Sequence, residues 1–257
     1  MDDIVKQAVE RAIETMRGNL GERLTIDDIA RSAMFSKFHF SRVFQRATGV
    51  SPGRFLSAMR LEEAKRLLVS TSFTVADISH RVGYNSVGTF SSRFRSSVGV
   101  SPTTYRQYRG TMTRIPLDER PFPRARSTVR GHVLAPPEGE LGLVFVGLFP
   151  SRILQAPPVR CAVLERPGPF ALPDVPLGTW HLMAHSVAPG TEDTIDAATY
   201  VGCNGPLTIH PDVVAKLADV QLRPMQSLDP PVLMALLDLR SAKLGLSGTT
   251  TPDSIAS

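Results

Sequence analysis

The sequence has few cysteines, a single tryptophan and no long apolar run. Its two thiols, Cys161 and Cys203, are too few for a disulfide framework and lack the spacing of a zinc site. The longest apolar runs, residues 232–237 and 143–146, are far shorter than the roughly 20 residues that span a bilayer. The first residues contain no apolar leader. These absences predict a cytoplasmic protein with no metal, no cofactor and no membrane partner.

Proline is scarce in the first part of the chain. Only Pro52 and Pro102 fall within residues 1–110, and the other 19 of the 21 prolines follow. Because proline breaks helices, the first part is predicted to be helical and the rest is predicted to be non-helical. Residues 1–110 contain 17 Lys and Arg against 10 Asp and Glu, and residues 127–257 contain 8 against 12. The net charges of +7 and −4 indicate two domains with different partners, of which the basic one suits a polyanion.

The basic part contains an internal repeat. Thr-Ile-Asp-Asp-Ile-Ala at 25–30 matches Thr-Val-Ala-Asp-Ile-Ser at 74–79, and Gly-Val-Ser-Pro at 49–52 recurs at 99–102. The first offset is 49 and the second is 50, so one extra residue lies in the turn of the second copy. In each copy a threonine N-cap begins a short helix, a second helix ends at glycine, and Ser-Pro begins another. This pattern is typical of a helix-turn-helix, whose second helix can enter the major groove of DNA.

The two copies are joined by a helix predicted over residues 51–69. Its 19 residues, at about 1.5 Å each, span about 28 Å. A rigid spacer of this length would set two recognition helices about one DNA turn apart, so that one chain reads two successive major grooves. The alternative interpretation is a plain helical bundle with a duplicated hairpin, which the basic charge and the placement of the arginines disfavour.

At these residues the sequence resembles the AraC/XylS family of bacterial transcription regulators. The resemblance rests on residues 24–30, 36–44, 49–52 and 60–68, and then on 77–79, 82–84, 90–91, 94, 99–102 and 105–106. It implies double-stranded DNA as the partner, with RNA polymerase as a further candidate, and no enzymatic activity. In this family the DNA-binding domain more often stands at the C-terminus, whereas here it comes first.

The resemblance also implies roles for individual residues. The base-facing set comprises Lys37, Phe38, Ser41, Arg42, Gln45, Asn85, Ser86, Val87, Thr89, Ser92 and Arg93. The candidates for phosphate contacts or structural braces are Arg46, Arg54, Arg60, Arg95 and Arg106. Arg42 is the main candidate for base reading, because a guanidinium can bond guanine O6 and N7 together.

Two of these positions leave alternatives open. Phe38 fits either a contact with a thymine methyl group or sugar, or a place in the core. The second unit has Ser92 where the first has Arg42, and Gly88 weakens the start of its helix. The second unit is therefore expected to read DNA shape or methyl groups, or to hold the backbone.

From residue 128 onward the pattern changes to short strands separated by Pro/Gly turns. Strands are predicted at 128–134, 143–149, 159–164, 169–172, 179–186, 207–209 and 220–222, which suggests an antiparallel sandwich. Residues 229–238 fit either a strand or a short helix. The segments 129–133, 146–149, 167–172 and 175–184 resemble prealbumin-like, carboxypeptidase-regulatory-type β-sandwich domains. Trp180 is expected in the core, and His181, His185 and His210 lack metal-ligand spacing.

The predicted fold class is therefore an all-α double helix-turn-helix domain followed by an antiparallel β-sandwich. The DNA-binding domain covers residues 1–110, with units at about 25–48 and 74–98 joined by a helix at about 51–69. A linker is expected at 111–127, an effector or interaction domain at 128–244, and a disordered tail at 245–257.

The leading hypothesis for function is a sequence-specific DNA-binding transcription regulator. A small molecule or a protein is the candidate effector of the second domain. The alternatives are a partner-binding scaffold with weak DNA binding and a DNA-targeted enzyme that uses a cysteine. The last is disfavoured, because neither cysteine has the His or Arg neighbours that would lower a thiol pKa.

Overall fold

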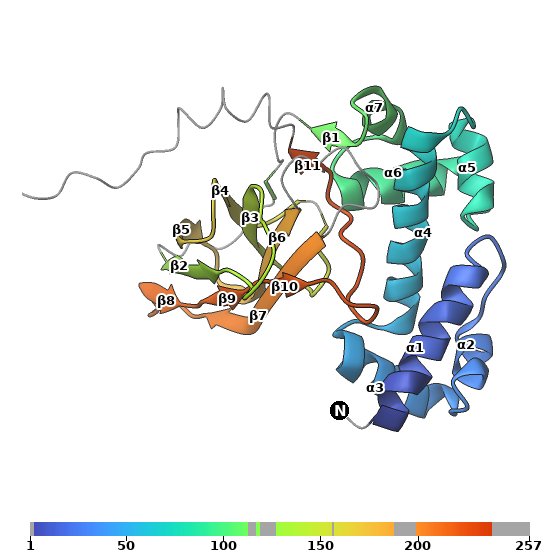
Figure 1. Cartoon of the computed structure of the whole chain (residues 1–257), viewed down its shortest axis with the longest axis horizontal. Coiled ribbons are helices and arrows are strands. Elements are labelled where there is room, and N and C mark those ends of the chain that lie inside the picture. Colours follow the sequence, from blue (N-terminus) through green and yellow to red (C-terminus); the bar gives the residue numbers. More distant parts are fainter. Residues whose placement is uncertain (1–2, 113–116, 119–126, 156, 188–198, 238–257) are drawn as a thin grey trace, which may run out of the picture.

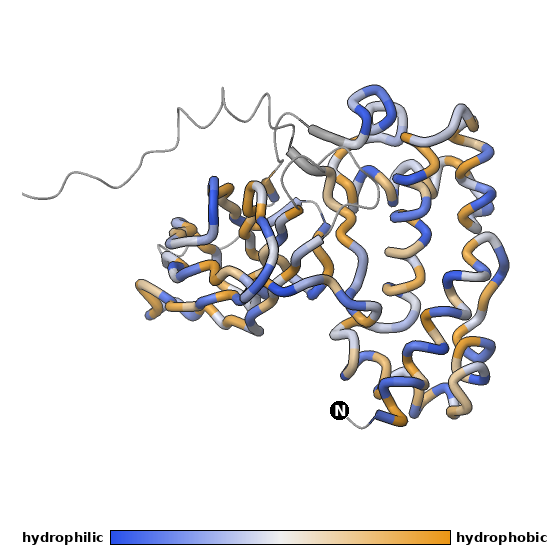
Figure 2. Tube along the Cα trace, in the orientation of Figure 1, coloured by the Kyte–Doolittle hydropathy of each residue, from blue (hydrophilic) through white to orange (hydrophobic). Residues whose placement is uncertain are grey.

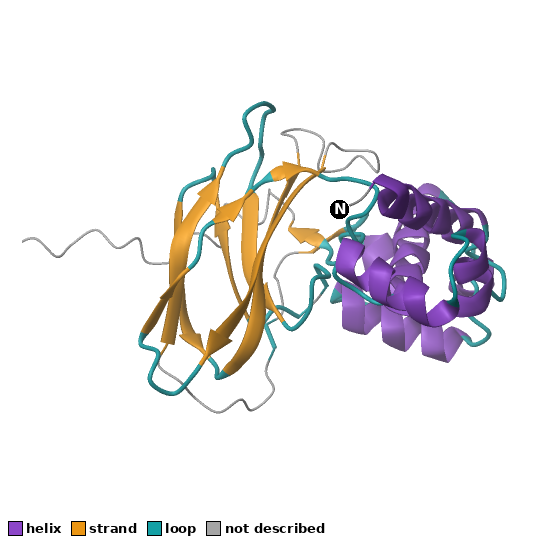
Figure 3. Cartoon of the chain, turned by 90° about the horizontal axis from the view of Figure 1, so that it is seen from below, coloured by secondary structure: helices purple, strands orange, loops and turns teal. Residues whose placement is uncertain are grey.

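The computed structural model describes residues 3–112, 117–118, 127–155, 157–187 and 199–237. Helices occupy one side of the molecule and strands the other (Figure 3). The predicted linker lies largely outside the described residues, and the predicted tail lies wholly outside them.

Seven helices form the first part of the described chain, as its low proline content predicts. They are α1 (Asp3–Gly18), α2 (Ile26–Ser32), α3 (Lys37–Thr48), α4 (Pro52–Ser70), α5 (Val75–Arg81), α6 (Val87–Val98) and α7 (Pro102–Gln107). The long helix α4 runs between two groups, with α1, α2 and α3 at one end and α5, α6 and α7 at the other (Figure 1). Hydrophobic and hydrophilic stretches alternate along the helices, as one-sided packing requires (Figure 2).

The two short helices begin in the same way. In α2 the hydroxyl of Thr25 accepts from the Asp28 amide at 3.2 Å, and the Asp28 carboxylate accepts from the Thr25 amide at 3.0 Å. Thr74 and Asp77 repeat this capping box in α5, at 3.1 and 3.0 Å. Hydrogen bonds from the threonine hydroxyls lower the pKa of both carboxyl groups. Each box satisfies amides that a helix start leaves free, which fixes where α2 and α5 begin.

Aromatic side chains repeat in the core of each unit. Phe44 packs edge-on against Phe55 with ring centroids 5.3 Å apart, and Phe94 packs edge-on against Tyr105 at 5.5 Å. Both recognition helices end at a glycine with positive φ, +80° at Gly49 and +101° at the matching Gly99. The repeat in sequence is therefore a repeat of caps, core and helix ends, with the extra residue in the α5–α6 turn as predicted.

The rest of the described chain is rich in strands. They are β1 (Thr111–Met112), β2 (Ser127–Leu134), β3 (Val144–Phe149), β4 (Arg160–Leu164), β5 (Pro169–Val175), β6 (Gly178–Val187), β7 (Thr199–Ile209), β8 (Ala215–Leu217), β9 (Val220–Gln221), β10 (Arg223–Pro224) and β11 (Leu236–Leu237). A five-stranded antiparallel sheet has the order β10-β7-β6-β3-β4. A second sheet has the order β5-β2-β8, with β9 also paired to β2.

The second sheet is mixed, because β8 and β9 both run parallel to β2. Strand β8 follows β7, which belongs to the other sheet, so the chain crosses between the sheets before it pairs with β2. Side chains of both sheets form one hydrophobic core that includes Val129, Leu182 and Trp180. Trp180 is 6% exposed and donates its indole N–H to the Pro176 carbonyl at 2.9 Å, as expected of a core residue.

Some elements differ from the sequence-based expectations. Strand β7 begins at Thr199, eight residues before the predicted 207–209 segment, because it pairs along most of β6 whatever its local pattern. The short β8 and β10 were not predicted, and residues 229–235 form neither a strand nor a helix before β11. These short strands depend on partners that are distant in sequence, so local periodicity gives no signal for them.

The end of the described chain packs on the helices. Ile153, Leu233 and Ala235 are at most 2% exposed and belong to the helical core. Lys65 of α4 donates to the Val232 carbonyl at 2.7 Å, and the Ala235 amide donates to the Val98 carbonyl at 3.1 Å. The segment after β10 thus runs beside α4 and reaches β11 next to β1 (Figure 1). The sheet-rich part is therefore attached along the spacer helix.

Candidate nucleic-acid interface

Helix α3 packs by one side and leaves the other open. Phe40 and Phe44 are fully buried, whereas Phe38, Arg42 and Gln45 are exposed. The 3.6-residue period separates the two sides, since positions 40 and 44 point to the core and 38, 42 and 45 point away. Phe38 is 80% exposed, which excludes the alternative that it is a core residue. An aromatic ring left this open beside an arginine is available to a partner.

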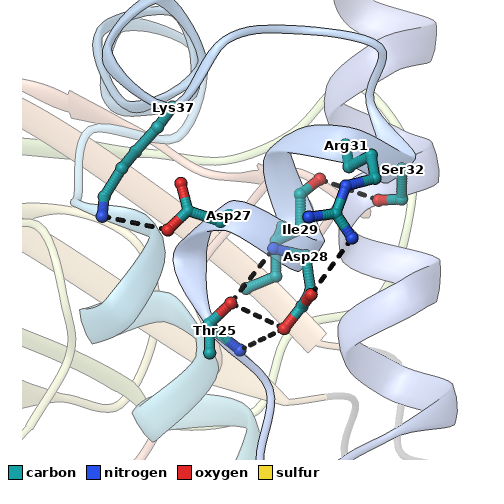
Figure 4. Close-up of polar contacts among 7 residues, drawn as sticks. All are labelled: Thr25, Asp27, Asp28, Ile29, Arg31, Ser32 and Lys37. Atoms are coloured by element: carbon teal, nitrogen blue, oxygen red, sulfur yellow. Dashed lines mark hydrogen bonds and ion pairs between the residues drawn. The ribbon is translucent and has the colours of Figure 1, made fainter.

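The beginning of α3 is tied to α2. Lys37 contacts the Asp27 carboxylate at 3.1 Å, as the close-up of this region shows (Figure 4). Both side chains are about half exposed, so the ion pair is weak and exchangeable. Ser41, a half-buried member of the predicted base-facing set, donates to the Lys37 carbonyl at 2.9 Å. Lys37 is therefore held at the exposed beginning of α3, with a charge that a partner could take over.

The second recognition helix presents a smaller outer surface. Gly88, Ser92, Arg95 and Ser96 stand one repeat after Phe38, Arg42, Gln45 and Arg46, and all four are exposed. Asn85, Ser86 and Thr89 are also exposed, Val87 is half-buried, and the Ser86 hydroxyl caps the helix by accepting from the Thr89 amide at 3.4 Å. Arg95 is the one long polar side chain among the four repeat-matched positions. This surface offers fewer groups for base-edge hydrogen bonds than α3 does.

Two of the arginines predicted as phosphate contacts or braces act as braces. Arg60 of α4 donates to the Glu22 carbonyl at 2.7 Å and packs where a side chain at Gly83 would stand. Arg106 of α7 donates to the carbonyls of Leu68 at 3.0 Å and Phe73 at 2.5 Å. The half-buried Arg60 therefore joins the spacer helix to the α1–α2 turn, and the half-buried Arg106 joins α7 to the end of the spacer helix. Sequence spacing alone did not separate this role from phosphate binding.

The remaining cations divide between two surfaces. Arg42, Arg46 and Arg95 are exposed on the recognition helices, and none has an ion pair with a described residue. Arg54 instead donates to Ser151 Oγ at 2.9 Å, across to the sheet-rich part. Arg93, predicted to face bases, lines a cavity together with Arg54. All five arginines are exposed, but only Arg54 and Arg93 line the cavity at the junction of the two parts.

Among the described residues, little supports a metal site, a reactive buried cysteine or a membrane-spanning helix. No cluster of three or more His, Cys, Asp or Glu side chains there could hold a metal ion. Burial raises the pKa of the Cys161 thiol to about 11, which makes it a poor nucleophile. Within the described part of the chain, no helix is both long and apolar enough to cross a bilayer.

Two helix-turn-helix units on one rigid spacer, each with an exposed recognition helix, define a DNA-binding protein. Residues 29–108 match a family model described as a helix-turn-helix domain. The transcriptional activator AarP of Providencia stuartii is 36% identical over 91 residues, which are 35% of this chain and 67% of that protein. The chain belongs to the AraC-type family of helix-turn-helix transcription regulators.

Other similarities cover the same share of the chain. The lactose operon transcription activator of Staphylococcus xylosus is 31% identical over 106 residues, which are 41% of this chain and 38% of that protein. A solved AraC-type regulator from Chromobacterium violaceum is 29% identical, with a TM-score of 0.39 over 40% of this chain and 91% of that one. The chain thus spans well under half of the Staphylococcus relative.

Proposed function

We propose that the whole protein is a sequence-specific transcription regulator that reads two successive major grooves. One observation carries this proposal: two capped, repeated units leave the outer sides of α3 and α6 exposed at opposite ends of one 19-residue helix. At about 1.5 Å per residue the spacer measures about 28 Å, close to the roughly 34 Å of one DNA turn. The net charge of +7 over residues 1–110 supplies attraction to phosphates.

The two recognition helices take different shares of the work. On α3, Arg42 reads a guanine, Phe38 contacts a thymine methyl group or sugar, and Gln45 and Ser41 complete the base-facing set. Lys37, Arg46 and Arg95 contact phosphates. Asn85 and Ser86 just before α6, and Val87, Thr89 and Ser92 on it, are too short for most base edges, so this helix reads groove shape and methyl groups.

The sheet-rich part supplies the regulatory function in this proposal. Its two sheets share one core, which supports a sandwich of the prealbumin-like kind, and it would hold an effector or contact RNA polymerase. A regulator of chromosomal genes works in the cytoplasm and needs no enzymatic activity. The proposed domain boundaries lie at residues 110 and 128. Leu233 and Ala235 follow the second boundary in sequence, yet they pack in the helical core.

The test is selection of bound sites from a random DNA pool, followed by affinity measurements over a salt series. We expect one preferred site with base preferences stronger on the α3 side. Arg42→Ala should relax the preference at one position at a cost of about 1–3 kcal/mol. The matched control Arg46→Ala should weaken binding to all sequences alike and lower the salt slope by about 1.

Two outcomes would contradict the proposal. A uniform loss for Arg42→Ala on every sequence would make that residue a phosphate contact. Equal affinity for the selected and random pools would favour the second candidate function, a partner-binding scaffold with weak DNA binding. The small side chains on the outer side of α6 are the observation that favours that candidate.

A further inference from the structure

A cavity of about 760 Å³ lies between the helical and sheet-rich parts. One wall is formed by the beginning of α4 and one side of α6, and the other by the segment between β3 and β4. The lining residues that matter here are Arg54, Ser57, Arg93, Ser97, Ile153 and Gln155. The volume lies in the range of small-molecule sites, about 300–1,000 Å³, and such sites favour junctions between domains.

The charge of this cavity is positive. Both arginines are exposed: the Arg93 guanidinium has no hydrogen bond or ion pair with a described residue, and the Arg54 guanidinium donates to the neutral Ser151 hydroxyl at 2.9 Å. Asp118 also lines the cavity and is 7% exposed, so two guanidinium groups face one carboxylate. A guanidinium without a counter-charge matches a carboxylate through two parallel hydrogen bonds.

The beginning of α4 adds amide donors at the same place. Ser51 stands at the N-cap, but its side chain makes no capping hydrogen bond. Pro52 has no N–H, and the Phe55 amide already donates to the Ser51 carbonyl at 3.0 Å. The amides of Gly53 and Arg54 therefore have no acceptor among the described residues. This end of a 19-residue helix has a partial positive charge, which favours an anion.

Ser97 adds a hydroxyl to the wall of the cavity. Ser97 is 6% exposed and lines the cavity, and its hydroxyl has no hydrogen-bond partner among the described residues. Its neighbour Ser96 behaves as an ordinary helical serine and donates to the Arg93 carbonyl at 2.9 Å. Ser97 follows Arg93 by about one turn of α6, so the two side chains lie on the same side of the helix and can both donate to an oxygen of a ligand in the cavity.

We propose that this cavity binds a small organic acid. Its carboxylate lies between Arg93 and the beginning of α4, and a second oxygen accepts from the Ser97 hydroxyl. Ile153 and Leu61 contact its carbon skeleton. The regulatory part of this inference rests on the proposed function, because Arg93 belongs to α6 and the ligand would join that recognition helix to the sheet-rich part.

The test uses the full chain without DNA and titrates it calorimetrically with succinate, with citrate and with the neutral amide succinamide. We expect saturable binding of an acid and none of the amide. Arg93→Gln should weaken acid binding roughly tenfold or more, because it removes a charge-assisted pair. The matched control Arg95→Gln removes an arginine of the same helix that does not line the cavity, and this variant should bind the acid as the unmodified chain does.

Three results would overturn the inference: no binding of either acid, equal binding of succinamide, or unchanged affinity in Arg93→Gln. If Arg93→Gln only lowers the salt dependence of DNA binding, the residue is a phosphate contact and the inference also falls. Operator binding is measured separately without acid. If the protein prefers its DNA site but binds no acid, the cavity inference fails and the proposed function stands. If it binds the acid but prefers no DNA site, the proposed function fails and acid binding by the cavity stands.

Discussion

His185 makes the junction between the two parts sensitive to acid. It lies near the end of β6, opposite Phe145 of β3 and Val201 of β7, and is 5% exposed. Burial, and then the nearby charge of Lys65, lower the pKa of His185 to about 4 from its usual 6.5. The folded protein therefore resists protonation of this side chain at pH values where the unfolded chain accepts a proton.

The sign and size of the effect follow from this difference. Between pH 6.5 and about 4 the unfolded state binds more protons, so the free energy of unfolding falls as the pH falls. A pKa difference of about 2.5 at 1.36 kcal/mol per unit gives a loss of roughly 3 kcal/mol by pH 4. Replacing the histidine with a side chain that does not titrate should remove that share of the acid sensitivity.

The assay is urea unfolding at a series of pH values, followed by the fluorescence of Trp180, the one tryptophan of the chain. Because Trp180 lies in the core of the sheet-rich part, it reports on the region that contains His185. We expect His185→Gln to flatten the curve between pH 6.5 and 4 relative to His210→Gln, an exposed control. Parallel curves for the two variants would refute the electrostatic reasoning.

Three further changes test the helix-turn-helix units, each by urea unfolding followed by circular dichroism. Met34 has a φ of +62° and is 82% exposed, so Met34→Gly should raise the free energy of unfolding by about 0.5–1 kcal/mol, and a loss would show that its side chain packs. Gly88→Ala should add about 0.5–1 kcal/mol, because its Cβ would lie 3.7 Å from the nearest atom; destabilisation would mean that α6 frays there. Thr74→Ala should remove about 1 kcal/mol by breaking the capping box, and no change would mean that the cap is not formed in solution.

Much of the helical part was predictable because its signals are local. The caps at Thr25 and Thr74 and the glycine ends of α3 and α6 all lie within a few residues of the helices they define. The repeat supplied a second, independent copy of each signal. The exposure of Phe38 was not decided by sequence, because an aromatic ring at the start of a helix suits a core and a groove equally well.

The junction of the two parts could not be predicted. Arg93 and Arg54 look like other arginines of a basic domain, and only the folded chain brings them to one cavity with residues from beyond β3. The same is true of Lys65, whose partner is a carbonyl 167 residues away. Such contacts depend on how the helical part and the sheet-rich part pack together. The local sequence pattern of one part carries no information about which residues of the other it will contact.

Residues 228–235 pack on the helices, and this contact affects when the helical part can finish folding. Residues 1–110 are synthesised before Ile153, Leu233 and Ala235, whose side chains complete the helical core. A nascent or shortened chain that stops before this segment would therefore carry a bare apolar strip along α4. The helical part therefore becomes fully packed only after residues 228–235 have been made, when the sheet-rich part is also present.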